Sequence, residues 1–249
     1  MPYRKMAFGS LSLLAGLAAL LFVWSCDNGD EDDPAGLAAG EWVLVEAAAW
    51  DGDRIVLTPD QPDTVGGAWY TASFDLALDF DLRFDVYLGD HDEEGADGIV
   101  FVIATESVAA QTGEGLGYQG IVPSIGIELD TYPNDGAHLG GNLGDPLDDH
   151  LAVDVDGSAD HHNSTRPLVT LPNLEDGTVH DLRVRWTAAT ELLEVFLDST
   201  APTISYDEDF IDQNLGGETL VRLGFTGSTG VYSNVQYIVP VKFASNRGE

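Results

Sequence analysis

Hard oxygen donors and one imidazole gather in a short stretch of the chain, residues 127–150. The stretch reads IELDTYPNDGAHLGGNLGDPLDDH, and its candidate ligands are Glu128, Asp130, Asn134, Asp145 and His150. Apolar and polar residues alternate over 127–132, so a strand would project Glu128, Asp130 and Tyr132 from one face, about 7 Å apart. Carboxylates this close repel each other unless a cation lies between them. Calcium takes about six to eight oxygens, and a transition ion such as manganese accepts carboxylates plus a histidine. The stretch therefore predicts a mixed divalent-metal site.

Four segments of the chain resemble, in order, motifs of the legume-type (L-type) lectins. The metal signature of that family is Glu-aromatic-Asp-Thr-x-x-Asn followed by Asp-Pro-x-x-x-His, and residues 128–134 and 145–150 are similar to it. Residues 96–101 (ADGIVF) resemble the family's Ala-Asp-Gly sugar-binding motif. Residues 115–118 (GLGY) resemble its glycine loop, and residues 223–230 (LGFTGSTG) its late Gly-Phe-Ser/Thr loop. The resemblance covers residues 42–245 and implies a calcium-dependent, carbohydrate-binding lectin that is not an enzyme.

The resemblance also implies roles for individual residues. The implied sugar-binding residues are Asp97, Gly115, Tyr132, Asn134 and Ser228. Asp97 would accept hydrogen bonds from sugar hydroxyls, and Tyr132 would stack on a sugar ring. The implied ligands of Ca2+ and of a manganese-like transition ion are Glu128, Asp130, the Tyr132 carbonyl, Asn134, Asp145 and His150, with Asp130 and Asp145 bridging the two ions. A cis peptide bond between Ala96 and Asp97 is a further implication.

Loop lengths leave some of these assignments open. Ten residues separate Asn134 from Asp145, more than in the plant lectins, so Asp135 or Asp148 is a candidate to take part of the role of Asp145. The glycine loop contains the triplet 113–115 (GEG), which leaves open the glycine that faces the sugar.

The segment after the predicted metal strand also departs from the family pattern. Asp156-Gly157 stands where the family has Asn-Ser, and Ser158 is the candidate replacement for the family's serine. The remaining histidines lack the sequence context of a ligand, so we predict that they are surface residues: His91, His138, His161, His162 and His180.

Length and periodicity predict one all-β domain, and the resemblance implies a concanavalin A-like jelly-roll β-sandwich of two antiparallel sheets. A chain of 249 residues is long enough to bury a large core. Strict alternation over 74–88 predicts one or two half-buried strands, and the apolar run 99–103 predicts a buried strand with Asp97 at its mouth. Residues 182–186 and 193–197, joined by the polar turn 187–190, predict a hairpin. Many strands with Gly and Asp turns favour a sandwich or jelly roll.

The first 40 residues are predicted to be a targeting segment and a spacer. Arg4 and Lys5 precede an apolar run, 11–24, in the order of a bacterial secretory signal. Cys26 is the only cysteine, and residues 23–26 (VWSC) resemble a lipobox, so Cys26 is the predicted lipidation site. An uncleaved signal anchor over the 19 residues 6–24 is the alternative. The predicted organisation is a signal peptide over 1–25, an acidic flexible linker over 26–40 and a lectin domain over 41–249.

Charge and export limit the expected partners. The acidic run directly after Cys26 resembles the surface-export signal of some Gram-negative lipoproteins. We therefore expect an exported, membrane-anchored lipoprotein of a bacterial cell envelope, with surface exposure left open. The formal net charge of −33 repels nucleic acid. The expected partners are glycans and, through the anchor, a membrane, and the oligomeric state is left open.

Two other classes of protein fit the same architecture. β-Glucan hydrolases carry the strand motif Glu-x-Asp-x-(x)-Glu, in which two carboxylates flank the scissile bond. Glu128-x-Asp130 is similar to the first half, but Tyr132 and Pro133 stand where the third acid is needed. A structural surface protein would keep the sandwich but have no use for convergent ligands beside Asp97. The residues therefore favour binding, with hydrolysis of a β-glucan as the alternative.

Overall fold

The computed structural model describes residues 41–106 and 113–242. The predicted signal peptide, the alternative signal anchor, Cys26 and the predicted linker lie outside the described residues. Within the described ranges, no helix is long and apolar enough to cross a membrane.

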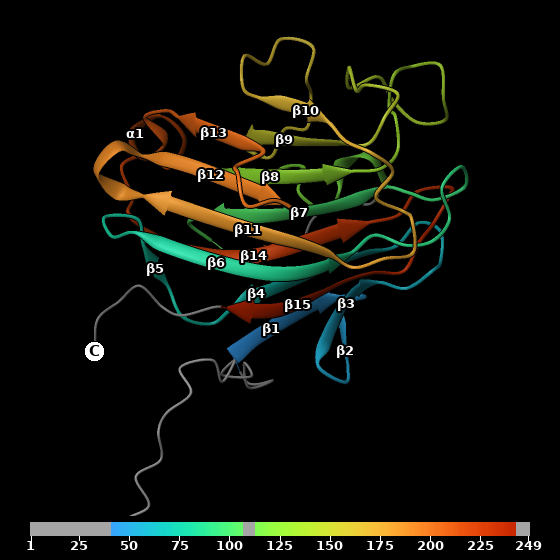
Figure 1. Ribbon diagram of the computed structural model, residues 1–249, viewed down its shortest axis with the longest axis horizontal. Coiled ribbons are helices and arrows are strands. Elements are labelled where there is room, and N and C mark those ends of the chain that lie inside the picture. Colours follow the sequence, from blue (N-terminus) through green and yellow to red (C-terminus); the bar gives the residue numbers. More distant parts are fainter. Residues whose placement is uncertain (1–40, 107–112, 243–249) are drawn as a thin grey trace, which may run out of the picture. The chain divides into compact units, whose positions relative to one another are not determined.

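The described chain folds into two antiparallel sheets (Figure 1). Sheet A has the strand order β1 (Trp42–Glu46), β4 (Val65–Tyr70), β14 (Leu220–Ser228), β7 (Gly98–Ala104), β8 (Ser124–Asp130), β9 (His150–Val155) and β10 (Leu168–Thr170), and β5 (Phe74–Asp75) pairs with β14. Sheet B has the order β13 (Ile204–Asp207), β12 (Leu192–Leu197), β11 (His180–Thr187), β6 (Phe80–Tyr87), β15 (Gln236–Lys242), β3 (Arg54–Thr58) and β2 (Ala49–Asp51). Short helical turns are η2 (Gly113–Gly115), η3 (Ala188–Thr190) and α1 (Phe210–Asn214). The predicted two-sheet sandwich is confirmed.

Alternating apolar side chains of the two sheets form the main core. Phe84 of β6 contacts Phe225 of β14 and Phe101 of β7, with ring centroids 4.8 Å and 5.6 Å apart. Trp186 of β11 is buried among these side chains, and its indole nitrogen donates to the Leu76 carbonyl at 2.9 Å. This packing stabilises the sandwich, because it removes the apolar inner face of each sheet from water.

Most of the predicted strands are present, with two differences at their ends. Residues 74–88 form β5 and β6 with a turn between them, and β11 and β12 form the predicted hairpin. Every residue of β7 is buried, as predicted for 99–103. However, β8 ends at Asp130, so Tyr132 lies in the following loop and not on the strand. Similarly, residues 223–228 of the predicted late loop belong to β14, and the loop begins at Thr229.

The strand register places the candidate ligands on the outer face of sheet A. Between β8 and β9, Asp130 lies opposite His150, and Gly126 lies opposite Asp154. Residues that lie directly opposite in an antiparallel pair point to the same face. The intervening residues of both strands belong to the main core, namely Ile127, Leu129, Leu151 and Val153. Glu128, Asp130, His150 and Asp154 therefore point away from that core, and loops bury them from the other side.

Candidate functional site

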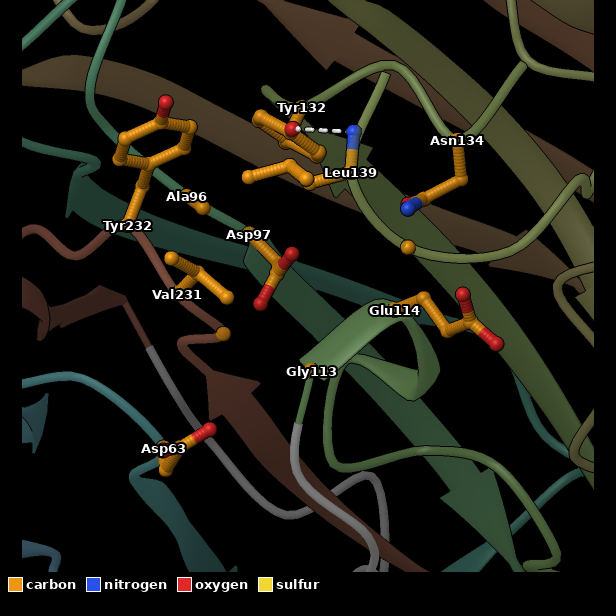
Figure 2. A pocket seen from close by; sticks show the side chains of 12 residues that line it. Asp63, Ala96, Asp97, Gly113, Glu114, Tyr132, Asn134, Leu139, Val231 and Tyr232 are labelled. Carbon is orange, nitrogen blue, oxygen red and sulfur yellow. Dashed lines mark hydrogen bonds between the residues drawn. The ribbon is translucent and has the colours of Figure 1, made fainter. Parts of the chain in front are cut away.

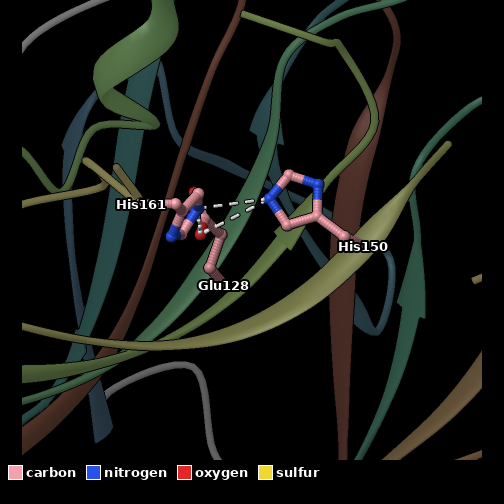
Figure 3. A group of neighbouring side chains, drawn as sticks. All are labelled: Glu128, His150 and His161. Carbon is pink, nitrogen blue, oxygen red and sulfur yellow. Dashed lines mark hydrogen bonds and ion pairs between the residues drawn. The ribbon is translucent and has the colours of Figure 1, made fainter. Parts of the chain in front are cut away.

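Three side chains on the outer face of sheet A offer ligand atoms within 4.8 Å of one another. They are Glu128 of β8, His150 of β9 and His161 of the segment after β9 (Figure 3). The Nε2 atom of His161 is 3.0 Å from Glu128 Oε2 and 3.3 Å from His150 Nε2. The distance from His150 Nε2 to Glu128 Oε2 is 3.8 Å. We call these three residues, with Asp145, the deep cluster, because Asp145 Oδ1 is 3.8 Å from His161 Nε2.

His161 was predicted to be a surface residue, and this prediction was wrong. Its side chain is only 6% exposed and faces the deep cluster. The cause is a tight reversal after β9: Asp156 and Gly157 both have positive φ, and Val155 bridges Ser158 across them. Two residues with positive φ between paired neighbours are typical of a type I′ turn, for which Asp-Gly is a favoured sequence. The chain therefore folds back over the outer face of sheet A and returns His161 to His150.

His180 was also predicted to be on the surface and is buried instead. Its ring nitrogens contact Asp198 Oδ2 at 2.7 Å and the Leu174 carbonyl at 3.1 Å, so it holds loops of the sandwich together. The side chains of His91, His138 and His162 are between 43% and 48% exposed, as predicted.

Several buried oxygens around the deep cluster make no hydrogen bond within the described part of the chain. They belong to Glu128 (both oxygens), Asp130 (Oδ2), Asn134 (Oδ1), Asp145 (Oδ1) and Asp154 (Oδ2). Burying a carboxylate without a partner costs several kcal/mol, at order of magnitude, and native proteins avoid it unless a cation or proton compensates. The donor set therefore fits divalent cations.

The titration behaviour of the deep cluster agrees with this interpretation. Burial raises the pKa values of Glu128 and Asp130, and repulsion from the Asp145 carboxylate raises them further. Burial is also the main cause that lowers the pKa of His150 to about 3, and the nearby His161 adds to the effect. A neutral imidazole is the form of histidine that binds a metal ion.

The loop after β8 brings four predicted ligands together beside the deep cluster. The Tyr132 backbone N–H donates to Asp130 Oδ1 at 2.7 Å, and the Asn134 N–H donates to Asp145 Oδ2 at 2.8 Å. These bonds occupy one oxygen of each carboxylate and leave the other without a partner. They also explain the end of β8, because the Tyr132 N–H bonds to a side chain instead of a neighbouring strand.

The alternative ligands lie elsewhere. Asp135 accepts hydrogen bonds from the backbone of Ala137 and His138, which lower its pKa to about 2 and tie it to its own loop. Asp148 is exposed, and so is Ser158, whose Oγ accepts from the Asp160 N–H. Within the loop 134–148, Asp145 is the carboxylate that reaches the deep cluster.

A cavity of about 280 Å³ opens beside the same loop (Figure 2). Its lining includes carboxylates, tyrosines and small apolar side chains: Asp63, Asp97, Glu114, Tyr132, Asn134, Leu139, Val231 and Tyr232. Figure 2 shows the rings of Tyr132 and Tyr232 on one side of the Asp97 carboxylate and the Glu114 side chain on the other. An apolar wall with a few convergent polar groups is typical of a small-molecule site.

The backbone of Asp97 is held by two hydrogen bonds, and its side chain lines the cavity. Its N–H donates to the Ser228 carbonyl at 3.0 Å, and its carbonyl accepts from the Thr131 N–H at 2.9 Å. The Ala96-Asp97 peptide bond is cis, as the resemblance implied. The next residue must be glycine, because Gly98 has φ +147° and a Cβ there would lie 2.2 Å from the Leu129 carbonyl. Burial, with the charges of Glu114 and Asp63, raises the pKa of Asp97 to about 7.

Gly115 and Ser228 lie next to the cavity but outside its lining. Gly113 and Glu114 line it in place of Gly115, whose Cβ would meet the Gln119 side chain. Ser228 is fully buried, and its hydroxyl donates to the Gly113 carbonyl at 2.6 Å. The structure thus gives Ser228 a supporting position, since it holds η2 against the end of β14.

Tyr232 is a lining residue that the sequence did not single out. Its ring lies 5.8 Å from that of Tyr132, at an interplanar angle of 53°. Two neighbouring aromatic rings present flat apolar surface to the cavity. The signal in the sequence was weak, because a lone tyrosine in a predicted loop does not show which way it points.

Comparison with known proteins identifies the family. The model of the legume lectin beta-barrel domain matches residues 38–242, most of the chain. The chain belongs to the legume lectin domain family. A lectin from Dioclea lasiophylla is 25% identical over 195 residues, which cover 68% of this chain and 62% of that protein. A lectin from Leucomphalos mildbraedii is 26% identical over 206 residues, with 75% and 79% covered. This legume lectin domain thus matches less than two thirds of the length of the Dioclea protein.

Solved structures show the same fold. The lectin from Bauhinia forficata in complex with GalNAc superposes with a TM-score of 0.69 at 21% identity, covering 83% of this chain and 93% of that one. The calcium-bound exoplasmic/lumenal domain of VIP36 gives a TM-score of 0.61 at 18% identity, covering 82% and 85%.

The family membership places the chain with lectins, which are carbohydrate-binding proteins and not enzymes, so the expectation of a non-enzyme is confirmed. The site of the legume lectin domain also does not suit a hydrolase. Glu128, which would be the first carboxylate of a β-glucan hydrolase motif, is fully buried beneath the loop after β8. A nucleophile or acid must reach the scissile bond.

Proposed function

We propose that this protein is a calcium-dependent lectin that binds a glycan in the cavity around Asp97. The observation that carries the proposal is the position of Asn134. This residue lines the cavity, its amide oxygen is buried without a hydrogen bond, and its backbone N–H donates to Asp145 Oδ2 at 2.8 Å, next to the unpartnered Asp145 Oδ1. An amide can offer its oxygen to a cation and its N–H groups to a sugar at the same time. Asn134 would thereby couple cation binding to sugar binding.

Within this proposal, two cations order the loop after β8. Calcium would be held by Asp130, the Tyr132 carbonyl, Asn134 and Asp145, which supply the hard oxygens that it prefers. A transition ion, manganese-like by the family resemblance, would be held by Glu128, Asp130, Asp145 and His150. The calcium-bound form of VIP36 supports the presence of calcium.

The sugar would bind through Asp97 and the aromatic wall. Above its pKa of about 7, the ionised Asp97 carboxylate gives strong, charge-assisted hydrogen bonds to sugar hydroxyls. A pyranose ring stacks on the flat face of a tyrosine. Structures of related fold are described as complexes with GalNAc and with Man3GlcNAc, which supports a glycan as the ligand.

The test of the proposed function is a glycan array probed with the full-length protein in calcium and again in excess chelator. We expect binding to a defined set of glycans in calcium and its loss in chelator. Equal binding in both conditions would contradict calcium dependence, and no binding to any glycan, with the protein folded and loaded with calcium, would contradict the lectin function. Hydrolysis of a β-glucan panel, run on the same protein, would reverse the exclusion of an enzyme.

We also propose that the protein is exported and anchored to a bacterial envelope through a lipid on Cys26. The motif at residues 23–26 and the acidic run that follows support this proposal. In a bacterial host, the wild-type protein should fractionate with membranes, and the Cys26→Ser variant should be released. A variant that stays in the membrane fraction would instead support an uncleaved signal anchor.

A further inference from the structure

The deep cluster contains a second imidazole that the family resemblance did not supply. His161 Nε2 is the atom nearest to Glu128 Oε2, at 3.0 Å, closer than the predicted ligand His150 at 3.8 Å. Both imidazoles point their Nε2 atoms at the same carboxylate (Figure 3). The exposed neighbour His162 behaves differently, because its Nδ1 contacts Asp160 at 2.9 Å and its side chain is 43% exposed.

The spacing of three ligand atoms suits one metal ion. Glu128 Oε2, His150 Nε2 and His161 Nε2 are separated by 3.0 Å, 3.3 Å and 3.8 Å, and Asp145 Oδ1 lies 3.8 Å from His161 Nε2 at the edge of this group. Ligands about 2.0 Å from a tetrahedral zinc ion lie about 3.3 Å from one another. Within the described part of the chain, Glu128 Oε2 and Asp145 Oδ1 are buried without a hydrogen bond. A set of two imidazoles and one carboxylate, with Asp145 beside it, thus fits a borderline-soft ion.

Asp154 gives His161 a supporting carboxylate. Its Oδ1 lies 3.9 Å from the other ring nitrogen of His161, Nδ1, and Asp154 is itself 4% exposed. A carboxylate near the far nitrogen of a ligating histidine favours the ring orientation in which the other nitrogen faces the ion. In this structure that other nitrogen is His161 Nε2, which lies 3.0 Å from Glu128 Oε2.

We propose that His161 is a direct metal ligand and that the deep cluster selects zinc over manganese. The proposal rests on the proposed function only in that both require a cation in this cluster. Imidazole nitrogen suits zinc, whereas manganese prefers carboxylate, carbonyl and water oxygens, and zinc also binds more tightly than manganese to a given nitrogen and oxygen site. Replacing an oxygen ligand by a second imidazole therefore favours zinc further.

The experiment is metal competition on the full-length protein. Metal-free protein is dialysed against equal zinc and manganese with calcium present, and the bound metals are counted by mass spectrometry. The wild-type protein should retain one zinc per chain and little manganese. His161→Ala and His161→Asn should lose zinc affinity by about 100-fold while manganese affinity changes by less than about threefold. The matched control, His162→Asn, should behave as the wild type.

A second readout reports the ligands themselves. Cobalt substituted into the wild-type protein should show the intense visible absorption of a four- or five-coordinate ion with nitrogen ligands, and the His161 variants should lose it. Circular dichroism and a glycan array on the same samples separate unfolding from metal loss.

Preferential manganese retention by the wild-type protein, or unchanged zinc affinity in both folded His161 variants, would overturn the assignment of His161 while leaving the lectin function in place. Failure of the wild-type protein to retain any transition ion would overturn it as well. Glycan binding that survives in chelator would count against the proposed function separately.

Discussion

At the scale of single residues, Asp97 is the side chain on which sugar binding should depend most. Its Oδ2 is buried without a hydrogen bond, beside the cavity and 3.3 Å from the position a Cβ would take on Gly230. Asp97→Asn removes the charge and turns one acceptor into a donor. A hydrogen bond to a charged group is worth about 1.5–3 kcal/mol, so glycan affinity should fall by about 10- to 100-fold. Isothermal titration with a glycan selected on the array measures this.

The control for that prediction is Asp53→Asn, because Asp53 is exposed in the turn between β2 and β3. It should bind the glycan with wild-type affinity. Asp97→Asn should also keep its melting temperature, since the substitution removes a buried charge and not a packed side chain. Wild-type affinity in Asp97→Asn would show that the sugar binds elsewhere.

The residue types of the site could be predicted from the sequence, but their positions could be predicted only in part. Asp97 and Asn134 lie at the cavity: Asp97 directly precedes β7, and Asn134 follows β8 after three residues, so both positions are set by strands whose apolar pattern is clear. His161 could not be placed, since its position depends on a two-residue turn that folds the chain over a sheet face. The Asp156-Gly157 pair was visible in the sequence, but which residue it would bring back to His150 depends on the path of the returning segment.

At the scale of strands and loops, alternation predicted the strands well and their ends poorly. The boundary of β8 is set by a side-chain hydrogen bond from the Tyr132 N–H to Asp130. Residues 223–228 join β14 because all of them pair with β7 and residues 224–228 also pair with β4. Neither cause leaves a periodic signal. Alternation in the sequence also did not predict that both faces of sheet A are buried at β8 and β9. The polar residues of these strands are covered by loops, whose paths the periodicity does not show.

Glu175 is linked through Asn234 to the backbone of Asp90 and His91, and we expect it to make the stability of the fold depend on pH. It is 2% exposed and accepts a hydrogen bond from Asn234, whose own oxygen accepts from the Asp90 and His91 N–H groups. Burial, with repulsion from Asp149, raises its pKa from 4.5 to about 9. The folded state therefore holds this proton where the unfolded state has lost it. Its contribution to stability is fully present below about pH 4.5 and is lost as pH rises to about 9.

The measurement is urea unfolding of the wild type and Glu175→Gln at pH 5, 7 and 9 in chelator. The free energy of unfolding of the wild type, taken relative to the variant, should fall by about 1.4 kcal/mol per pH unit within this window. Titration of the metal ligands cancels in the difference, because both proteins contain them. Parallel stability curves would show that Glu175 is not held protonated.

At the scale of the whole molecule, the unpartnered carboxylates should make the fold depend on divalent cations. A ligand present at about 100 times its dissociation constant adds about 2.7 kcal/mol to stability. For a domain of this size each kcal/mol shifts the melting temperature by about 2–4 °C. Chelator should therefore lower the melting temperature by about 5–10 °C, and calcium with a transition ion should restore it. Differential scanning calorimetry measures both steps.

Glu128→Gln serves as the control for the thermal experiment, since it removes one ligand charge from the deep cluster without changing the side-chain volume much. Its melting temperature should respond less to chelator than that of the wild type. Identical responses would mean that the cations stabilise the fold from another site.

A crystal structure of the metal-loaded protein, soaked with a glycan selected on the array, would test the coupling of metal and glycan binding at one site. We expect cations, located by anomalous scattering, against Asp130, Asn134 and Asp145 and in the deep cluster. We also expect a sugar whose hydroxyls bond to the Asp97 carboxylate and the Asn134 amide. A sugar bound on another surface, or an Asn134 side chain in contact with neither cation nor sugar, would contradict the claim that one site couples metal and glycan binding.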